Sequence, residues 1–317
     1  MIMKEIYSEL MNVLKEGCPA ALCTKLLPDG KSEKWVDRHP ETASDEADIC
    51  RENYLPEERL IILGGGHVSR PLALFGTESG FAVTVVDDRP AFANRQRFPE
   101  VRQVLCESFE RCFEKLKITS NDYVVVVTRG HRYDMDCLRA LLSGTEPAYM
   151  GMMGSKRRVI GVKNLLIEEG YDPYAIDRIH MPIGLPIGAL TPPEIAVSIL
   201  AELIQVKRSR KQDFEPSDAD FAVLEKLSVE GEPHSIVTVL ETRGSTPRRP
   251  GAKMIVYPEG RIVGSIGGGC AEAEVMREAL HYIGTGKCGK ITVDMTKDVS
   301  EEDVMVCGGT MTVLIEG

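Results

Sequence analysis

The sequence has no apolar stretch that approaches the ~20 residues needed to cross a lipid bilayer. Residues 1–17 carry apolar side chains at the spacing of an amphipathic helix, without the continuous apolar core of a signal peptide. We therefore expect a cytoplasmic protein. The sequence also lacks an excess of basic residues, because its formal net charge is −10. This charge argues against non-specific binding of nucleic acid, which requires a basic surface.

Motifs for metal sites and for disulfide scaffolds are absent as well. The nine cysteines are odd in number and no pair has the CxxC spacing, which argues against a zinc knuckle and against a disulfide framework. The six histidines include no HExxH motif, so we predict no metal site. No Ser-His-Asp arrangement is visible either.

The middle of the chain shows a regular alternation of apolar runs and helical patterns. Such short, nearly continuous apolar runs are typical of strands buried on both faces of a parallel sheet, and they occupy residues 60–63, 81–86, 123–127 and 148–152. Together with the helices between them they predict the α/β class: a Rossmann-like, doubly wound parallel sheet over residues 58–212. A polar, charged linker follows.

Residues 218–317 predict a smaller α+β domain of five strands and one helix, residues 271–283. Residues 1–57 predict a helix, a strand over residues 20–27 and, from residue 37, a connecting loop. Residues 10–24 align weakly with residues 223–238, and both read as helix, Glu-Gly, Pro and strand. The N-terminal segment is therefore either a truncated copy that packs on the C-terminal domain or a coincidence among common helix–strand sequences.

The first predicted strand of the sheet runs into Gly64-Gly65-Gly66-His67, a turn that opens a helix. Glycines at this point permit a tight turn and let backbone N–H groups approach a pyrophosphate. Asp87 ends the next strand and lies at the distance expected of an acid that binds a ribose diol, with Arg89 beside it. The alternative is a turn that only lets the helix pack on the sheet.

Further polar residues follow the other strands at the same predicted sheet edge. His131 follows the third strand, and Ser155 and Lys156 follow the fourth, where they could hold an anion at a helix N-terminus. The cofactor-binding candidates in this domain are Gly64, Gly65, Gly66, His67, Asp87, Asp88, Arg89, His131, Ser155 and Lys156.

The C-terminal domain has the denser glycine motifs. Consecutive glycines before a helix expose N–H groups to an anion, and Cys270 would lie at that helix N-terminus, where the dipole lowers a thiol pKa. The catalytic candidates are Cys270, as a thiol at a sulfur site, and Cys307; the alternative for both is a small buried residue. The cofactor-binding candidates are Gly244, Ser245, Arg248, Gly267, Gly268, Gly269 and Glu272. Glu272 has a second interpretation, as an acid that only complements the helix dipole.

These motifs together resemble the XdhC/CoxI family. Residues 83–89, 97–99, 130–131, 150–155 and 183–189 resemble its Rossmann domain, and residues 244–248, 264–272 and 307–309 resemble its other domain. The resemblance implies an accessory protein for molybdenum hydroxylases of the xanthine dehydrogenase type. Such a protein binds molybdenum cofactor (molybdopterin), assists its sulfuration by a cysteine desulfurase and inserts it into the apo-enzyme, and it tends to form a homodimer.

The domain order departs from the usual one in the family, because here the glycine- and cysteine-rich domain follows the Rossmann domain. The resemblance favours a non-catalytic maturation factor. The net charge and the lack of a long apolar stretch argue against nucleic acid and membrane as partners. One alternative is an NAD(P)-dependent oxidoreductase that uses the glycine turn and Asp87. A pure scaffold between partner proteins is another. The lack of cysteine spacing for iron–sulfur clusters argues against the hydroxylase itself.

Overall fold

The computed structural model describes residues 3–40, 48–210, 214–294 and 309–317, and for Cys270 the backbone alone. The chain forms two compact units. One contains residues 57–211. The other combines the N-terminal residues up to Pro56 with the C-terminal residues from Gln212 onward.

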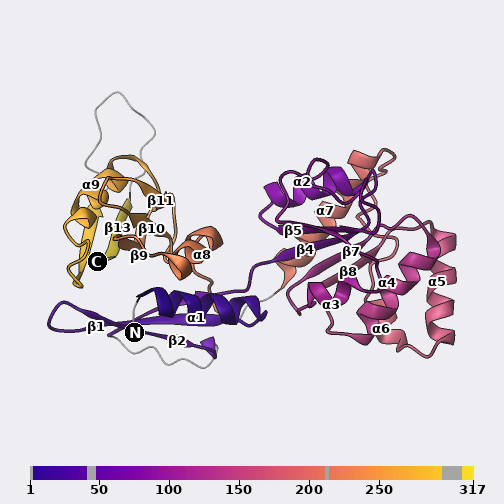
Figure 1. Cartoon of the computed structure of the whole chain (residues 1–317), viewed down its shortest axis with the longest axis horizontal. Helices are drawn as coiled ribbons and strands as arrows, with labels where there is room; N and C mark the ends of the chain where they lie inside the picture. The colour runs from indigo at the N-terminus through magenta and orange to yellow at the C-terminus, as the bar shows by residue number, and fades with distance from the viewer. Residues whose placement is uncertain (1–2, 41–47, 211–213, 295–308) are drawn as a thin grey trace. The chain divides into compact units, whose positions relative to one another are not determined.

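The unit of residues 57–211 is a five-stranded parallel sheet in the order β6-β5-β4-β7-β8. Figure 1 shows β5, β4, β7 and β8 of this sheet side by side. The strands are β4 (Arg59–Leu63), β5 (Ala82–Asp87), β6 (Gln103–Cys106), β7 (Tyr123–Val126) and β8 (Tyr149–Met152). The helices are α2 (Ser69–Glu78), α3 (Cys112–Leu116), α4 (His131–Ser143), α5 (Lys156–Glu168), α6 (Pro173–Asp177) and α7 (Pro192–Ser209).

Alternating side chains of the central strands supply two separate cores. Leu60 and Ile62 pack with α2 and α7 on one face, whereas Ile61 and Leu63 pack with α3 to α6 on the other. This alternation explains why β4 is apolar at every buried position, since both of its faces are covered. The predicted Rossmann-like class is confirmed. The short edge strand β6 was missed because its residues are mostly exposed or half-buried.

The second unit contains a five-stranded antiparallel sheet in the order β11-β10-β9-β13-β12. Its strands are β9 (Ser235–Gly244), β10 (Lys253–Val256), β11 (Ile262–Gly264), β12 (Cys288–Asp294) and β13 (Gly309–Glu316). Its helices are α8 (Phe221–Val229) and α9 (Gly269–Leu280). Helix α9 packs on one face of this sheet through Ala271, Val275 and Ala279.

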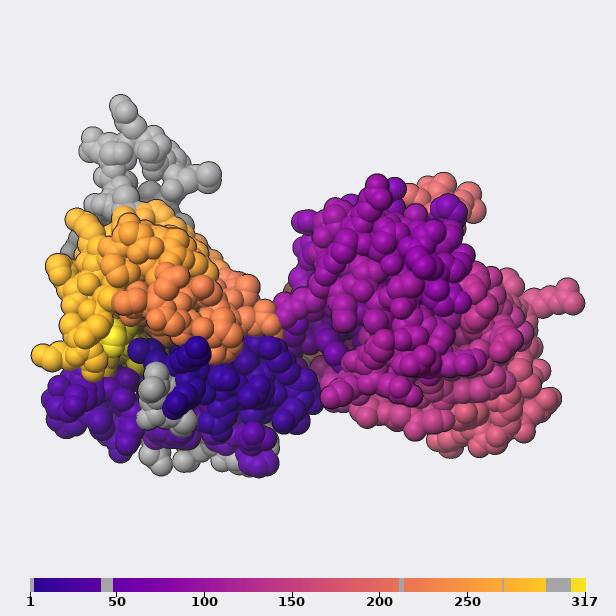
Figure 2. All heavy atoms as spheres, viewed as in Figure 1, coloured from indigo at the N-terminus to yellow at the C-terminus, as the bar shows by residue number. Residues whose placement is uncertain are grey.

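The N-terminal segment covers the opposite face. It forms α1 (Met3–Lys15) and a three-stranded sheet of β1 (Ala20–Leu26), β2 (Ser32–Asp37) and β3 (Ile49–Tyr54) in the order β2-β1-β3. Leu10 and Leu14 of α1 share one core with Leu224 of α8 and Ile236 of β9. Figure 2 shows the indigo N-terminal residues directly against the orange and yellow C-terminal residues. The two segments of the weak repeat are thus both a helix followed by a strand, and their helices pack together.

The expectation of a connecting loop over residues 37–58 was wrong in its second half, because β3 lies there. Its alternating polar residues conceal a buried face: Glu52 is 6% exposed and forms an ion pair of 2.8 Å with the fully buried Lys253 of β10. Thr238 and Tyr54 complete this network, at 2.8 Å from Lys253 Nζ and 2.7 Å from Glu52 Oε2 respectively. A buried charge that keeps its partner and its hydrogen bonds is tolerated, and it fixes how β3 meets β10.

Candidate functional site

The Gly64-Gly65-Gly66 turn joins β4 to α2 at the carboxyl edge of the parallel sheet, as predicted. Gly64 has a φ of +117°, and a Cβ there would overlap the carbonyl of Val127. The turn is also held by Ser69, whose hydroxyl donates to the Gly64 carbonyl at 2.5 Å. Gly64 is therefore required by the packing of the turn itself, whatever ligand lies near it.

Asp87 occupies the position where a ribose diol is expected. The residue is 1% exposed, and its carboxylate accepts hydrogen bonds from Gly65 N at 2.8 Å and from Arg89 Nε and Nη2 at 2.8 and 2.9 Å. Burial raises the pKa of Asp87, but the hydrogen bonds from Arg89 and Gly65 outweigh it, so the pKa lies below its ordinary value. Both oxygens are engaged within the chain, and a sugar would have to displace these donors.

Aromatic and basic side chains also close the turn. A Cβ at Gly65 would overlap the Phe92 carbonyl, and Arg89 lies 3.7 Å from the centre of the Phe92 ring. Arg97 donates to the carbonyls of Gly65 and Gly66, at 3.0 Å in each case. In the Rossmann turn, the charge of Asp87 is thus balanced by Arg89, and side chains and carbonyls of the same unit occupy most of the space beside the glycines.

Of the remaining candidate residues at this edge, some have side chains that form hydrogen bonds within the unit and others have side chains exposed to solvent. Asp88 accepts from Arg129 Nη2 at 2.9 Å. Ser155 caps α5 by accepting from Arg158 N at 3.3 Å. His67, His131 and Lys156 have exposed side chains. The edge therefore presents two imidazole rings and one ammonium group to solvent.

A buried carboxylate at this edge was missed in the sequence. Asp134 of α4 is 1% exposed, with Thr128 and Arg158 as hydrogen-bonding partners. Burial raises the pKa of Asp134, and the two partners offset this only in part. Nothing in the local sequence distinguishes Asp134 from an ordinary first-turn acid, because Arg158 reaches it from the next helix.

The second glycine loop joins β11 to α9. Gly267, Gly268 and Gly269 have φ angles of +132°, +75° and +70°, and a Cβ at Gly268 or Gly269 would meet nothing within 4 Å. No side chain caps α9. The first amides of a helix have no partner within it, so this loop presents backbone donors in open surroundings.

Glu272 organises the loop from inside. Its Oε2 accepts from Ser265 Oγ at 2.6 Å, from Ile266 N at 3.1 Å and from Gly268 N at 3.0 Å. Three donors therefore converge on one carboxylate oxygen, and no cation pairs with it among the described residues. The amides of Gly269 and of the residues after it lie beyond this carboxylate.

The structure places the two predicted thiols and the predicted anion-binding Arg248 in different surroundings. Cys270 is the second residue of α9, so its backbone lies at the helix N-terminus as expected. Cys307 lies outside the described residues. Arg248 donates to Asp218 Oδ2 at 2.8 Å and to Asp220 Oδ2 at 3.2 Å, so an anion would have to displace these two acids. Gly244 ends β9, and the exposed Ser245 follows it.

Two kinds of feature are absent from the described part of the chain. No three or more His, Cys, Asp or Glu side chains are grouped there so that they could hold a metal ion. None of the helices in the described ranges is both long enough and apolar enough to span a membrane.

Comparisons with known proteins identify two domains. Residues 60–203 match the model of the XdhC Rossmann domain, and residues 227–294 match the model of the XdhC and CoxI family. The Rossmann domain therefore comes first in this chain. The two matches correspond to the two sets of motifs that resembled this family.

Related proteins match parts of the chain. A probable xanthine dehydrogenase subunit from Bacillus subtilis (strain 168) is 35% identical over 153 residues, which are 48% of this chain and 44% of that protein. Molybdenum cofactor insertion chaperone PaoD from Escherichia coli (strain K12) is 36% identical over 80 residues, 25% of each. The matched regions thus span less than half the length of either curated relative.

One solved structure supports the same relationship. The crystal structure of a xanthine dehydrogenase (BH1974) from Bacillus halodurans is similar with a TM-score of 0.51 and 30% sequence identity, over 67% of this chain and 66% of that chain. Both domain models, the relatives and this structure agree with the motifs found in the sequence. The chain belongs to the XdhC/CoxI family.

Proposed function

We propose that this chain is an accessory protein of a molybdenum hydroxylase of the xanthine dehydrogenase type, which binds molybdenum cofactor and assists its sulfuration and its insertion into the apo-enzyme. The observation that carries the proposal is the open loop of positive-φ glycines before α9, because it presents backbone donors without a Cβ in the way. The similarity to a molybdenum cofactor insertion chaperone supports the same ligand class.

The residues of the loop fit an anionic group. In the proposal, the amides of Gly269, Cys270 and Ala271 at the N-terminus of α9 hold the phosphate of the pterin, since a helix N-terminus favours negative charge. Glu272 accepts hydrogen bonds from the amides of Ile266 and Gly268 and so orders the loop, and in the proposal it does not contact the phosphate. When bound, the cofactor supplies the molybdenum centre that the client enzyme uses.

The thiols have a proposed role that follows from their position. Cys270 lies in the first turn of α9, where the helix dipole favours the thiolate over the thiol. A thiolate beside the bound pterin would be placed to interact with the sulfur ligand of the metal, and Cys307 is the second candidate. A cysteine desulfurase, an apo-hydroxylase and a second copy of the chain remain proposed partners.

Copurification tests this function. We would express the chain in a host that makes molybdenum cofactor, oxidise the extracted pterin and measure its fluorescence per chain. We expect pterin on the wild-type chain, and a loss of client hydroxylase activity with Cys270→Ala. Cys106→Ala is the matched control, because Cys106 is exposed and lies in the other unit. A wild-type chain without pterin, together with full client activity for Cys270→Ala, would contradict the proposal.

A further inference from the structure

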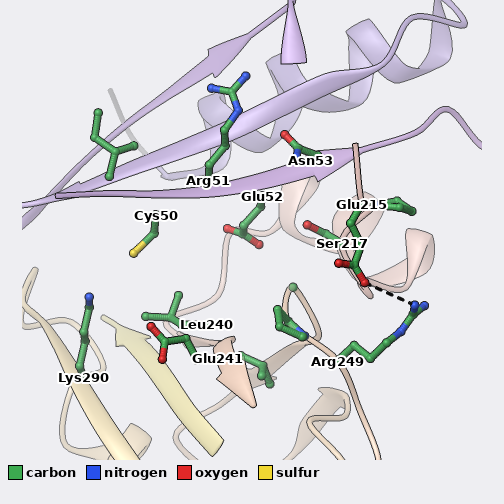
Figure 3. A pocket seen from close by; sticks show the side chains of 15 residues that line it. Cys50, Arg51, Glu52, Asn53, Glu215, Ser217, Leu240, Glu241, Arg249 and Lys290 are labelled. Atoms are coloured by element: carbon green, nitrogen blue, oxygen red, sulfur yellow. Dashed lines mark ion pairs between the residues drawn. The ribbon is translucent and has the colours of Figure 1, made fainter. Parts of the chain in front are cut away.

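A cavity of about 320 Å³ lies within the second unit, between β3 of the N-terminal segment and the C-terminal sheet. Figure 3 shows its wall, to which β3 contributes Cys50 and Glu52, β9 contributes Glu241, and β12 contributes Lys290. Residues 49–53 are outside both matched family domains. The cavity therefore exists only because the N-terminal segment covers this sheet.

A β-bulge shapes the cavity. Val239 of β9 pairs with Val313 and Glu241 pairs with Thr312, so Leu240 is the extra residue between them. A bulge bends its strand and redirects the neighbouring side chains, and bulges occur often beside binding sites. Here the irregular stretch, residues 239–241, lines the cavity.

Two opposite charges at the cavity have no partner among the described residues. These are the carboxylate of Glu241 and the ammonium group of Lys290, whereas Glu52 is neutralised by Lys253 at 2.8 Å. The guanidinium group of Arg249 is also available to a ligand, because its ion pair with Glu215 is 4.0 Å long and both side chains are mostly exposed. Exposed pairs of this length contribute little. The lining thus offers two cations, Lys290 and Arg249, and two anions, Glu241 and Glu215.

Cys50 adds a thiol. It is half-buried and unpaired with another cysteine, and in Figure 3 its sulfur and the ammonium group of Lys290 are directed into the same part of the cavity. The thiolate is the form of a cysteine side chain that attacks a disulfide.

From these groups we infer that the cavity binds a small thiol peptide or the disulfide of that peptide. Each peptide unit carries two carboxylates, one ammonium group and one sulfur atom that reaches Cys50. The carboxylates meet Lys290 and Arg249, and the ammonium group meets Glu241. In the exchange, the Cys50 thiolate attacks one sulfur of the small disulfide, the S–S bond breaks, and a mixed disulfide forms. The other half leaves as a thiolate and takes up the proton that Cys50 lost.

The test compares a charged and a neutral disulfide on the full chain. Glutathione disulfide is the charged probe and hydroxyethyl disulfide the neutral one, and peptide mass spectrometry measures the rate at each cysteine. We expect glutathione disulfide to modify Cys50 several-fold faster than the exposed Cys18 and Cys106, and hydroxyethyl disulfide to show a smaller preference. Equal rates at the three cysteines with glutathione disulfide would overturn the inference.

Charge variants separate recognition from simple thiol reactivity. Lys290→Met and Glu241→Gln should lower the rate with glutathione disulfide several-fold and affect hydroxyethyl disulfide less. Lys287→Met is the control, because Lys287 is exposed in the same segment and does not line the cavity. If both probes slow equally in Lys290→Met, Lys290 acts on the thiol alone and the site for a charged ligand is refuted. This outcome is independent of pterin binding at α9.

Discussion

Two glycine turns of this chain precede a helix, and in each of them a backbone N–H of a glycine donates to a carboxylate of the same unit. At the Rossmann turn, the buried carboxylate of Asp87 accepts from Gly65 N and forms an ion pair with Arg89. At the loop before α9, Glu272 accepts from Gly268 N without a cation in the described surroundings. The first turn is packed against Phe92 and Val127, whereas the second is open at Gly268 and Gly269. A glycine motif therefore indicates a backbone conformation, and its surroundings decide whether a ligand can approach.

The largest effect is expected from a Cβ at the two turns. Gly64→Ala combines a positive φ with an overlap of the Val127 carbonyl, so we expect a loss of about 4 kcal/mol from its unit. Gly268→Ala has only the conformational cost of its φ of +75° and ψ of −174°, about 1–3 kcal/mol, because the space is open. Urea unfolding measures both.

The single tryptophan makes this comparison specific to one unit. Trp35 lies in β2 of the unit that contains residues 1–56, so its fluorescence reports that unit, while far-ultraviolet circular dichroism reports both. Gly64→Ala should shift the circular dichroism transition and leave the tryptophan transition unchanged. Similar losses for the two variants would remove the contrast between the turns.

The next effect concerns the buried acid. Asp87→Asn removes the carboxylate that pairs with Arg89 at 2.8 Å and leaves Arg89 only Asp88, at 4.0 Å, which should cost about 2 kcal/mol. Because the folded pKa of Asp87 is depressed, its contribution is full above the unfolded value of about 4 and is lost as the pH falls through the folded pKa. Acid titration of the circular dichroism signal should therefore be less steep in Asp87→Asn. An unchanged acid transition would show that Asp87 is not stabilised by Arg89 and Gly65.

A smaller effect is expected at the open loop. Glu272→Gln replaces a charged acceptor by a neutral one for three donors, which should cost about 1 kcal/mol and speed hydrogen exchange at Ile266 and Gly268. Glu274→Gln, an exposed position of the same helix, is the control. Equal exchange in the two variants would mean that Glu272 does not order the loop.

The smallest effect is expected when a nicotinamide cofactor is added to the protein. Titration with NADH should give no saturable change in its fluorescence, because both oxygens of Asp87 are engaged by Gly65 and Arg89. Saturable binding would contradict the closed Rossmann turn and revive the oxidoreductase alternative.

The sequence predicted the backbone of both turns better than their surroundings. Apolar runs and glycines located β4, β5 and α9, because the period of buried positions and the need for positive φ are local properties. The contacts that decide function are not local. Arg97 reaches Gly65 across 32 residues, and Glu52 meets Lys253 across the two ends of the chain. No pattern within a window of sequence encodes such pairs.

The most direct test of the central claim is the pterin content of two glycine variants. Gly269→Ala changes the open loop and Gly66→Ala the Rossmann turn. At both positions a Cβ would meet nothing within 4 Å, and only Gly269 has a positive φ, of +70°. Each chain would be purified from a host that makes molybdenum cofactor, and its pterin would be measured per chain. The account predicts that Gly269→Ala loses most of the pterin and that Gly66→Ala keeps it. Loss in Gly66→Ala with retention in Gly269→Ala would contradict it.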